Sequence, residues 1–246
     1  MNIKGLTDVG KRRNNNQDAF GFHSFSESEC LLVVCDGMGG AAGGSIASTM
    51  VRDIFIERIV DSYNSDMNFK SLKNLFDSAI NAANISVFDK AMNDETLLGM
   101  GTTLVAVLIK DDTAFLANVG DSRAYIIKND DDSHIEQITI DHSIVQMMVE
   151  CGQITAEEAQ VHPKRNIITR AIGVADSVKA DFYTLDFDVK DKFLLCSDGL
   201  TNYVKIDKIC DIISKNTAEV AVSMLIDEAN KNGGGDNITA VIAEIE

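Results

Sequence analysis

The chain has 246 residues, 45% of them hydrophobic, which is enough for a sizeable core and excludes an intrinsically disordered protein. Its formal net charge of −16 disfavours nucleic acid as a partner. No apolar run is long enough to cross a bilayer and the first residues lack a secretory apolar stretch, so we expect a cytoplasmic protein that does not associate with membranes.

The first hundred residues predict three strands followed by two long helices. Extended, β-rich stretches place the strands at residues 3–9, 19–25 and 30–35. Apolar residues then recur at helical spacing over residues 44–60 and 69–92. The change from strand to helical periodicity shows that both classes of element are present in one continuous stretch of chain.

A strand meander follows the helices. Residues 102–109, 113–118 and 124–128 are rich in β-formers and are separated by turn signals. The acidic run at residues 129–133 then has the composition of a solvated hairpin tip. Unlike the aspartates discussed below, it does not follow an apolar strand that leads into a glycine turn, so it is a poor candidate for a metal site.

The last hundred residues mix short helices with further strands and two amphipathic helices. In chain order we expect helices at 143–151 and 156–160, strands at 180–185 and 192–196, helices at 206–214 and 218–231, and a final strand at 238–244. There is one proline, no linker and no internal repeat, which favours one domain over residues 1–246. Strand blocks with helix pairs between them indicate an α+β fold.

Five scattered cysteines without a C-x-x-C spacing argue against a zinc site or a disulfide framework and fit a reducing compartment. Carboxylates carry the stronger signal. Asp36 and Asp198 each end an apolar run and precede a glycine, Asp18 stands where a strand begins, and Asp236 opens the last strand. If these positions converge, the aspartates form a self-repelling cluster that a hard divalent cation such as Mg²⁺ or Mn²⁺ would stabilise.

The short motifs around these aspartates, taken in their order along the chain, resemble those of the PPM family of metal-dependent Ser/Thr protein phosphatases (type 2C) in its bacterial single-domain form. The resemblance runs from Thr7-Asp8-Val9-Gly10 through Asp36-Gly37-Met38-Gly39-Gly40, Gly120-Asp121-Ser122-Arg123 and Ser197-Asp198-Gly199 to Gly235-Asp236-Asn237-Ile238-Thr239. It implies a four-layer αββα sandwich, in which two antiparallel sheets are flanked by helix pairs, with a metal cleft at one end.

The resemblance also implies a ligand set. Asp36 would bridge two ions, the Gly37 carbonyl and Asp18 would serve the second ion, and Asp198 and Asp236 would complete the first. Many bacterial relatives hold a third, weaker ion, and Asp121 matches that position. Asn237 would orient the site from its edge.

The implied chemistry is hydrolysis by an activated water. A water between two metal ions has a lowered pKa, and the ions offset charge that develops on the phosphate. Arg13 matches the phosphate-binding arginine of the family, since a guanidinium can grip two phosphate oxygens at once. An exposed surface residue is the alternative interpretation of Arg13.

Two positions, Gln17 and Met38, depart from the family pattern, and a third, His142, could be mistaken for a catalytic residue. Gln17 stands where an acidic residue is common, and it cannot supply a carboxylate to the second ion. Met38 replaces a histidine proposed as general acid in animal members, so the group that protonates the leaving oxygen is unidentified. His142 is more simply a structural residue, beside Asp141 or Ser143 as the cap of the next helix.

Residues 151–170 match the family's flap, which lies beside the cleft and influences substrate access. Lys164 and Arg165 on this flap would meet a phosphopeptide, or would belong to a solvated loop. Arg123 and Arg170 are expected to form structural ion pairs. Thr102 and Thr103 are expected to line the core beneath the metals.

The function implied is hydrolysis of phosphoserine and phosphothreonine in proteins, in a signalling role that reverses a bacterial Ser/Thr kinase, by a monomer. The alternative is a catalytically silent, metal-stabilised regulatory domain, although such members usually lose ligand aspartates and none is lost here. A nuclease with two metals is a third possibility, which the net charge and the lack of a basic stripe disfavour.

Overall fold

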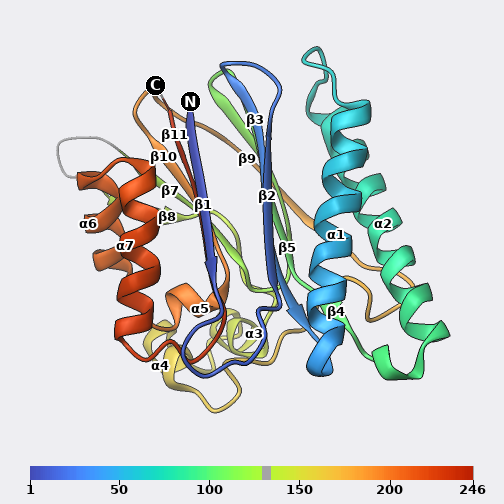
Figure 1. The fold of residues 1–246 in the computed structure, drawn as a ribbon. Helices are drawn as coiled ribbons and strands as arrows, with labels where there is room; N and C mark the ends of the chain where they lie inside the picture. The colour runs from blue at the N-terminus through green and yellow to red at the C-terminus, as the bar shows by residue number, and fades with distance from the viewer. Residues whose placement is uncertain (129–133, 246) are drawn as a thin grey trace.

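The computed structural model of the chain describes residues 1–128 and 134–245. Two antiparallel sheets face each other at its centre (Figure 1). The first sheet has the strand order β1 (Asn2–Asp8), β11 (Ile238–Glu244), β10 (Lys192–Cys196), β7 (Arg123–Lys128) and β8 (His134–Gln137). The second has the order β2 (Asp18–Ser24), β3 (Glu29–Met38), β5 (Leu104–Lys110), β6 (Thr113–Val119) and β9 (Asp181–Asp186), with the short β4 (Gly101–Thr102) paired to the end of β3.

A helix pair covers the outer face of each sheet (Figure 1). The helices α1 (Gly40–Ser62) and α2 (Phe69–Asn93) lie on the second sheet, and α6 (Ile206–Lys215) and α7 (Ala218–Lys231) lie on the first. Shorter helices lie at one end: α3 (Ile144–Glu150), α4 (Ala156–Val161) and α5 (Asp198–Thr201). The four-layer αββα sandwich expected from the sequence is confirmed.

The core lies in three layers, because the central strands are buried on both faces. In β3, Leu32 and Val34 point into the layer between the sheets, whereas Leu31, Val33 and Cys35 point under α1 and α2. This alternation is the period-2 geometry of a strand, and burial on both sides explains why the segment is continuously apolar. None of the five cysteines, all of which lie in the described ranges, forms a disulfide bond, and only Cys151 is exposed.

Strand β3 is longer than the sequence predicted. Its ladder continues through Asp36 to Met38, where β4 pairs with Gly37 and Met38, so Asp36 lies within a strand and not just beyond one. Helix α1 begins four residues earlier than predicted, directly after Gly39, whose φ of 114° is a conformation that only glycine adopts without strain. The apolar pattern marks where a strand is buried, and the ladder continues past it through backbone hydrogen bonds.

Strand β8 was not predicted. Its sequence His134-Ile135-Glu136-Gln137 is short, largely exposed and pairs on one side only, so no apolar periodicity marks it. The predicted hairpin tip at 129–133, together with the question of a metal role there, lies outside the described residues. None of the helices in the described ranges is long and apolar enough to cross a membrane.

A buried lysine joins the helix pair α6–α7 to its sheet. Lys192 donates to the carbonyl oxygens of Ile213 (3.2 Å) and Asn216 (2.7 Å) at the end of α6, and its Nζ lies 2.8 Å from Glu244 Oε1. Glu244 in turn accepts a hydrogen bond from the Ala218 N–H at the start of α7. A cation at a helix C-terminus and an anion at a helix N-terminus both complement the helix dipoles.

Replacing this lysine should therefore destabilise the fold. We expect Lys192→Met to lower the free energy of unfolding by about 2–3 kcal/mol, because it leaves a half-buried carboxylate and two carbonyls without their donor. Lys4→Met is the matched control, since the Lys4–Glu219 pair is exposed and should contribute less than about 1 kcal/mol. Urea unfolding measures both variants, and equal losses would contradict the assigned role of Lys192.

Candidate metal centre

Five aspartates from separate segments converge at one end of the sandwich. Asp18 and Asp36 are paired across β2 and β3, Asp121 lies in the turn between β6 and β7, Asp198 begins α5 directly after β10, and Asp236 lies just before β11. Asp36 is at the centre. Burial raises the pKa of its carboxyl well above the ordinary value, and the charges of all four other aspartates raise it further.

Hydroxyl groups beneath Asp36 fix its backbone. Its N–H donates to Thr103 Oγ1 (2.9 Å), and its carbonyl accepts from Thr102 Oγ1 (2.8 Å) and from the Thr103 N–H (2.9 Å). Both threonines are buried, as the sequence predicted. Gly37 follows in a crowded position, where a Cβ would overlap the carbonyl oxygens of Gly44 and Gln17. Only glycine fits there.

Asp18 is held by two hydroxyls and keeps one oxygen unpaired. Its Oδ2 accepts hydrogen bonds from Ser197 Oγ (2.7 Å) and Thr239 Oγ1 (2.6 Å). Its Oδ1 is buried and has no hydrogen-bond partner among the described residues. Burial raises the pKa of Asp18 to about 7, against the two hydroxyl hydrogen bonds, and the charges of Asp198 and Asp236 add to the increase. A buried, unpartnered carboxylate oxygen is an available ligand for a cation.

Asp198 and Asp236 take their hydrogen bonds from neighbouring polar groups. Asn202 Nδ2 donates to Asp198 Oδ2 (3.0 Å), and Arg13 Nη2 donates to Asp236 Oδ2 (2.9 Å). Burial raises the pKa of Asp198, and Asp236 is the next largest cause. The hydrogen bond to Asp236 raises the pKa of Arg13, whose side chain is 53% exposed. Arg13 is thus both anchored at the cluster and open to solvent.

Asn237 closes the edge of the cluster. Its Nδ2 donates to the carbonyls of Val9 (2.9 Å) and Asn15 (3.0 Å), and its Oδ1 accepts from the Gln17 N–H (2.8 Å). These bonds tie the loop that carries Arg13 to the start of β11. Gln17 itself points its amide to the Gly40 carbonyl (2.8 Å).

Asp121 lies close to Asp198 but belongs to a different turn. Burial raises the pKa of Asp121 to about 8, and the charge of Asp198 is the next cause. The neighbouring Arg123 forms a bidentate pair with Asp141, with Nε and Nη2 to carboxylate distances of 2.9 and 2.6 Å. The expectation that Arg123 makes a structural ion pair is confirmed.

The residues present fit a divalent cation, although the carboxylates of Asp18, Asp198 and Asp236 accept hydrogen bonds from protein donors. Among the described residues, no three His, Cys, Asp or Glu side chains already form a closed ligand set. The cluster nevertheless combines carboxylates of raised pKa, an unpaired Asp18 oxygen and a nearby Gly37 carbonyl. Such oxygen donors suit Mg²⁺ or Mn²⁺, and a cation would offset both the burial of these charges and their mutual repulsion, which together raise the pKa values.

His142 is buried in a structural network next to this cluster. Its Nδ1 accepts a hydrogen bond from the Gly120 N–H (3.0 Å), and its Nε2 lies 3.0 Å from Asp181 Oδ2. Arg170 donates to Asp181 Oδ1 (2.9 Å), which confirms the ion pair expected of Arg170. Burial lowers the pKa of His142, so the ring is neutral near pH 7. Ser143, one of the two expected caps, accepts from the Gln146 N–H at the start of α3.

A family model described as protein phosphatase 2C matches residues 8–238. The chain belongs to this family. The match covers nearly the whole length, so the resemblance carried by the aspartate phrases is confirmed.

Relatives of the type 2C family agree over the full chain. The serine/threonine phosphatase stp of Listeria innocua is 35% identical, over 99% of this chain and 96% of that protein. Stp1 from Staphylococcus aureus, in its crystal structure, is 39% identical over 99% of this chain and 94% of that one, with a TM-score of 0.92. The catalytic domain of the phosphatase PstP, solved with two manganese ions, is 32% identical over 99% and 97% of the two chains, with a TM-score of 0.85.

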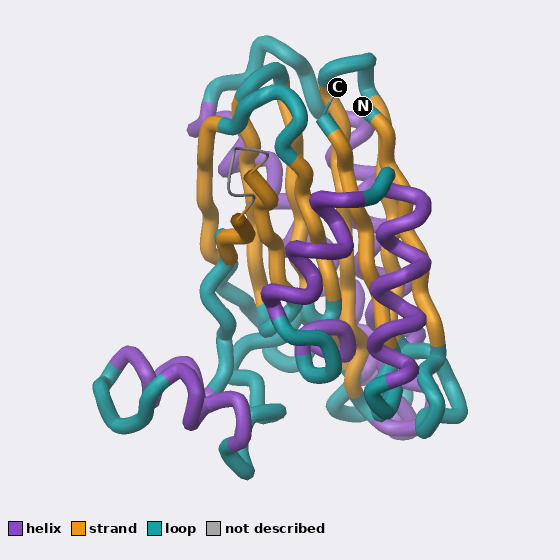
Figure 2. The backbone as a smooth tube through the Cα atoms, turned by 90° about the vertical axis from the view of Figure 1, so that its left-hand side faces the viewer, coloured by secondary structure: helices purple, strands orange, loops and turns teal. Residues whose placement is uncertain are grey.

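The predicted flap residues lie away from these contacts. Figures 1 and 2 show α3 and α4 projecting beyond the end of the type 2C sandwich. Lys164 and Arg165 are exposed in the loop after α4, and within the described ranges only their backbone groups are hydrogen-bonded. The structure therefore does not join them to the aspartates.

Sequence reasoning missed the hydroxyl groups that hold Asp18. Ser197 stands directly before Asp198, and Thr239 is the second residue of β11. No signal in the sequence distinguishes Ser197 from an ordinary turn serine.

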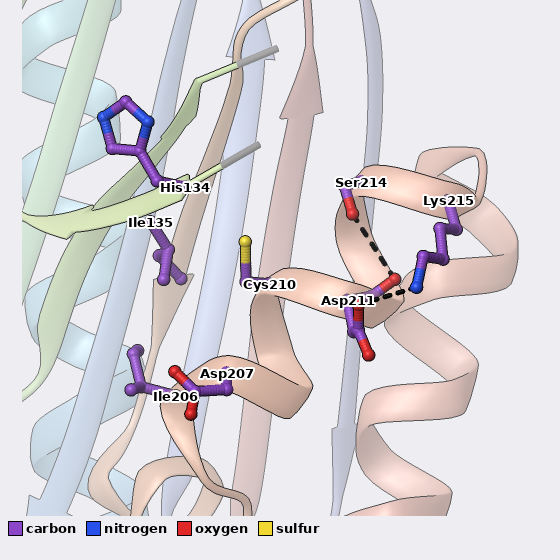
Figure 3. A pocket seen from close by; sticks show the side chains of 8 residues that line it. All are labelled: His134, Ile135, Ile206, Asp207, Cys210, Asp211, Ser214 and Lys215. Carbon is purple, nitrogen blue, oxygen red and sulfur yellow. Dashed lines mark hydrogen bonds and ion pairs between the residues drawn. The ribbon is translucent and has the colours of Figure 1, made fainter. Parts of the chain in front are cut away.

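A separate pocket of about 480 Å³ lies between β8 and α6 (Figure 3). It contains none of the predicted site residues. Its lining includes Ile135, Ile206 and Cys210 beside the charged Asp211 and Lys215. Because the pocket contains none of the predicted site residues, the aspartate cluster, and not the pocket, is where we expect the chemistry.

Proposed function

We propose that this chain hydrolyses phosphoserine and phosphothreonine in proteins with the help of bound Mn²⁺ or Mg²⁺. One observation carries the proposal: the complete set of five aspartates converges at one end of a type 2C fold, with Asp36 at its centre. The relatives are named Ser/Thr phosphatases, which favours an enzyme over a catalytically silent domain.

Each ligand role follows the position of the residue. Asp36, Asp198 and Asp236, with Asp18 and the Gly37 carbonyl, would hold two core ions, and Asp121 with Asp198 would hold a third. When bound, such ions supply an activated water and stabilise charge on the phosphate. The protein fixes the ligands through Thr103, Ser197 and Thr239, which limits their reorganisation during turnover.

Arg13 would bind the phosphate group. Its guanidinium is held at the edge of the cluster by Asp236 and has further N–H groups open to solvent. A planar guanidinium can donate two parallel hydrogen bonds to a phosphate, so it would orient the ester against the aspartates. Met38 carries no titratable proton, so the leaving oxygen takes its proton from another source.

Replacing Arg13 should weaken substrate use without unfolding the chain. We expect Arg13→Ala to lower kcat/KM on a phosphothreonine peptide by about 10–100-fold, the value of one or two hydrogen bonds to a charged group. Arg12→Ala is the matched control, because Arg12 is the adjacent exposed arginine. Steady-state kinetics measure both, and an equal loss in the two variants would refute the specific role of Arg13.

The wider context follows the family. The proposed partners are a bacterial Ser/Thr kinase and its targets, in a cytoplasmic signalling role, and the enzyme would act as a monomer. The proposed single domain spans residues 1–246, and its flap at about 151–170 would offer Lys164 and Arg165 to a phosphopeptide. Both side chains are exposed, which such a contact requires.

The proposal is tested by phosphate release from a phosphothreonine peptide after EDTA treatment, followed by addition of Mn²⁺. Activity should disappear with EDTA and return with Mn²⁺. A chain that binds Mn²⁺ but releases no phosphate from phosphothreonine or phosphoserine peptides would support the silent regulatory domain instead. Release from nucleic acid only would support the nuclease.

A further inference from the structure

Segment 143–180 carries α3 and α4. Its base, where the segment meets the sandwich, is closed by backbone hydrogen bonds. The Thr169 N–H donates to the His142 carbonyl (2.8 Å), and the Ile144 N–H donates to the Ile167 carbonyl (2.9 Å). Because these bonds join residues 142–144 to residues 167–169, α3 and α4 are attached to the sheets as one unit. Figure 1 shows α3 and α4 at the same end of the sandwich as α5, which begins with Asp198.

At this base, His142 is hydrogen-bonded to both the carbonyl and the N–H of Gly120. Its backbone N–H donates to the Gly120 carbonyl (2.9 Å), and its ring Nδ1 accepts from the Gly120 N–H (3.0 Å). Gly120 has a φ of 106°, and a Cβ there would meet Thr103. The turn is therefore fixed at one conformation, and Asp121 is the next residue along it.

The far side of the same turn is attached to Asp36. Ser122 Oγ lies 2.7 Å from Thr103 Oγ1, which also accepts the hydrogen bond from the Asp36 N–H. A continuous chain of hydrogen bonds thus runs from the base of segment 143–180 through the turn to the central aspartate. The turn is held from Thr103 on one side and from His142 on the other, and Asn118 Nδ2 also donates to the Gly120 carbonyl (3.3 Å).

Asp181 sets the orientation of the His142 ring. Because Nδ1 accepts the Gly120 N–H, the proton of the neutral ring is on Nε2, which faces Asp181 Oδ2 at 3.0 Å. Asp181 begins β9 and also binds Arg170, so both residues that follow α4 hold the ring in place. Arg170 Nη1 also lies 3.1 Å from Nε2, so Arg170 and Asp181 both contact this side of the ring.

We propose that His142 is a positioning residue that holds the Gly120–Asp121 turn from the base of segment 143–180, so that the ligand geometry of Asp121 depends on how that segment is seated. The inference rests on the proposed function, in which Asp121 binds a metal ion. Hydrogen-bond partners behind a ligand commonly change metal affinity by about 10–100-fold.

Two substitutions separate the contacts of the ring. His142→Asn keeps an acceptor at the place of Nδ1 and loses the group that faces Asp181. His142→Gln keeps a donor at the place of Nε2 and loses the acceptor for Gly120. Calorimetric titration with Mn²⁺ measures both, and Asp121→Asn identifies which binding event belongs to Asp121.

We expect His142→Gln to weaken the event that Asp121→Asn removes by about tenfold or more, and His142→Asn to change it by less than about threefold. Equal affinities in wild type and both variants, or equal losses in both, would overturn the positioning role. An Asp121→Asn chain that binds Mn²⁺ like wild type would overturn both this inference and the third ion, while phosphate release by the wild type tests the catalytic proposal separately.

A second measurement does not depend on the folding of any variant. Amide hydrogen exchange of the wild-type chain is followed with and without Mg²⁺. Binding at Asp121 should slow exchange of the Ile144 and Thr169 amides about fivefold or more, the lower range of ordinary coupling between sites. Unchanged exchange at these two amides, with slower exchange near Asp36, would overturn the coupling.

Discussion

An Asp36→Asn chain should fold normally and lose about 1,000-fold or more of its Mn²⁺-dependent phosphatase activity. Burial raises the pKa of Asp36, and the charges of all four other aspartates raise it further. The Asp36 carboxylate therefore lies at the centre of the cluster. Asparagine keeps the shape and the backbone hydrogen bonds to Thr102 and Thr103, yet it removes the charge that would bind a cation. Asp198→Asn should have a similar effect, for Asp198 is the neighbour of both Asp236 and Asp121.

Asp61→Asn is the matched control, because Asp61 is an exposed aspartate in the last turn of α1 and is not one of the five aspartates of the cluster. Phosphate release and circular dichroism should be measured for all three variants. If Asp36→Asn and Asp198→Asn both kept activity within tenfold of wild type, the metal assignment would be wrong.

The metal-free chain should become less stable as the pH rises from 6.5 to 8.5, by about 2–4 kcal/mol in the free energy of unfolding. Burial raises the folded-state pKa of Asp18 to about 7 and of Asp121 to about 8. Below these values the folded chain holds protons that the unfolded chain has released. Stability from this source is therefore lost as the pH rises through the folded-state pKa values.

The pH window is chosen to separate this effect from His142. The pKa of His142 is lowered by burial, so this residue costs stability only as the pH falls below about 6.5. Urea unfolding in EDTA at pH 6.5, 7.5 and 8.5 makes the measurement, and saturating Mg²⁺ should remove the decline. Asp18→Asn should also reduce it, and a metal-free chain that is equally stable across the window would contradict the buried, repelling cluster.

Much of the architecture could be predicted because apolar burial is periodic. Strands β10 and β11 and helix α7 have the predicted bounds, and β3 was found from its apolar run. What the pattern missed lacks an apolar signal. Strand β8 is a polar edge strand, and the last residues of β3 continue through backbone pairing that side chains do not announce.

The candidate site also has a part that the sequence could predict and a part that it could not. The aspartates could be found because each has a glycine or strand end beside it, and the structure brings all five together. Their supports could not, because the bonds to Asp18 from Ser197 and Thr239 join residues 179 and 221 positions apart. Lys164 and Arg165 came only from resemblance, and their part in substrate binding stays a prediction.

The central claim is that this cluster binds divalent cations, and calorimetric titration of the EDTA-treated chain with Mn²⁺ at pH 7 tests it most directly. The titration is repeated in two buffers of different ionisation heat. We predict at least two ions for each chain, with proton release on binding, because Asp18 and Asp121 are partly protonated at this pH. Failure of the wild-type chain to bind Mn²⁺ or Mg²⁺, or binding that Asp36→Asn leaves unchanged, would contradict the claim.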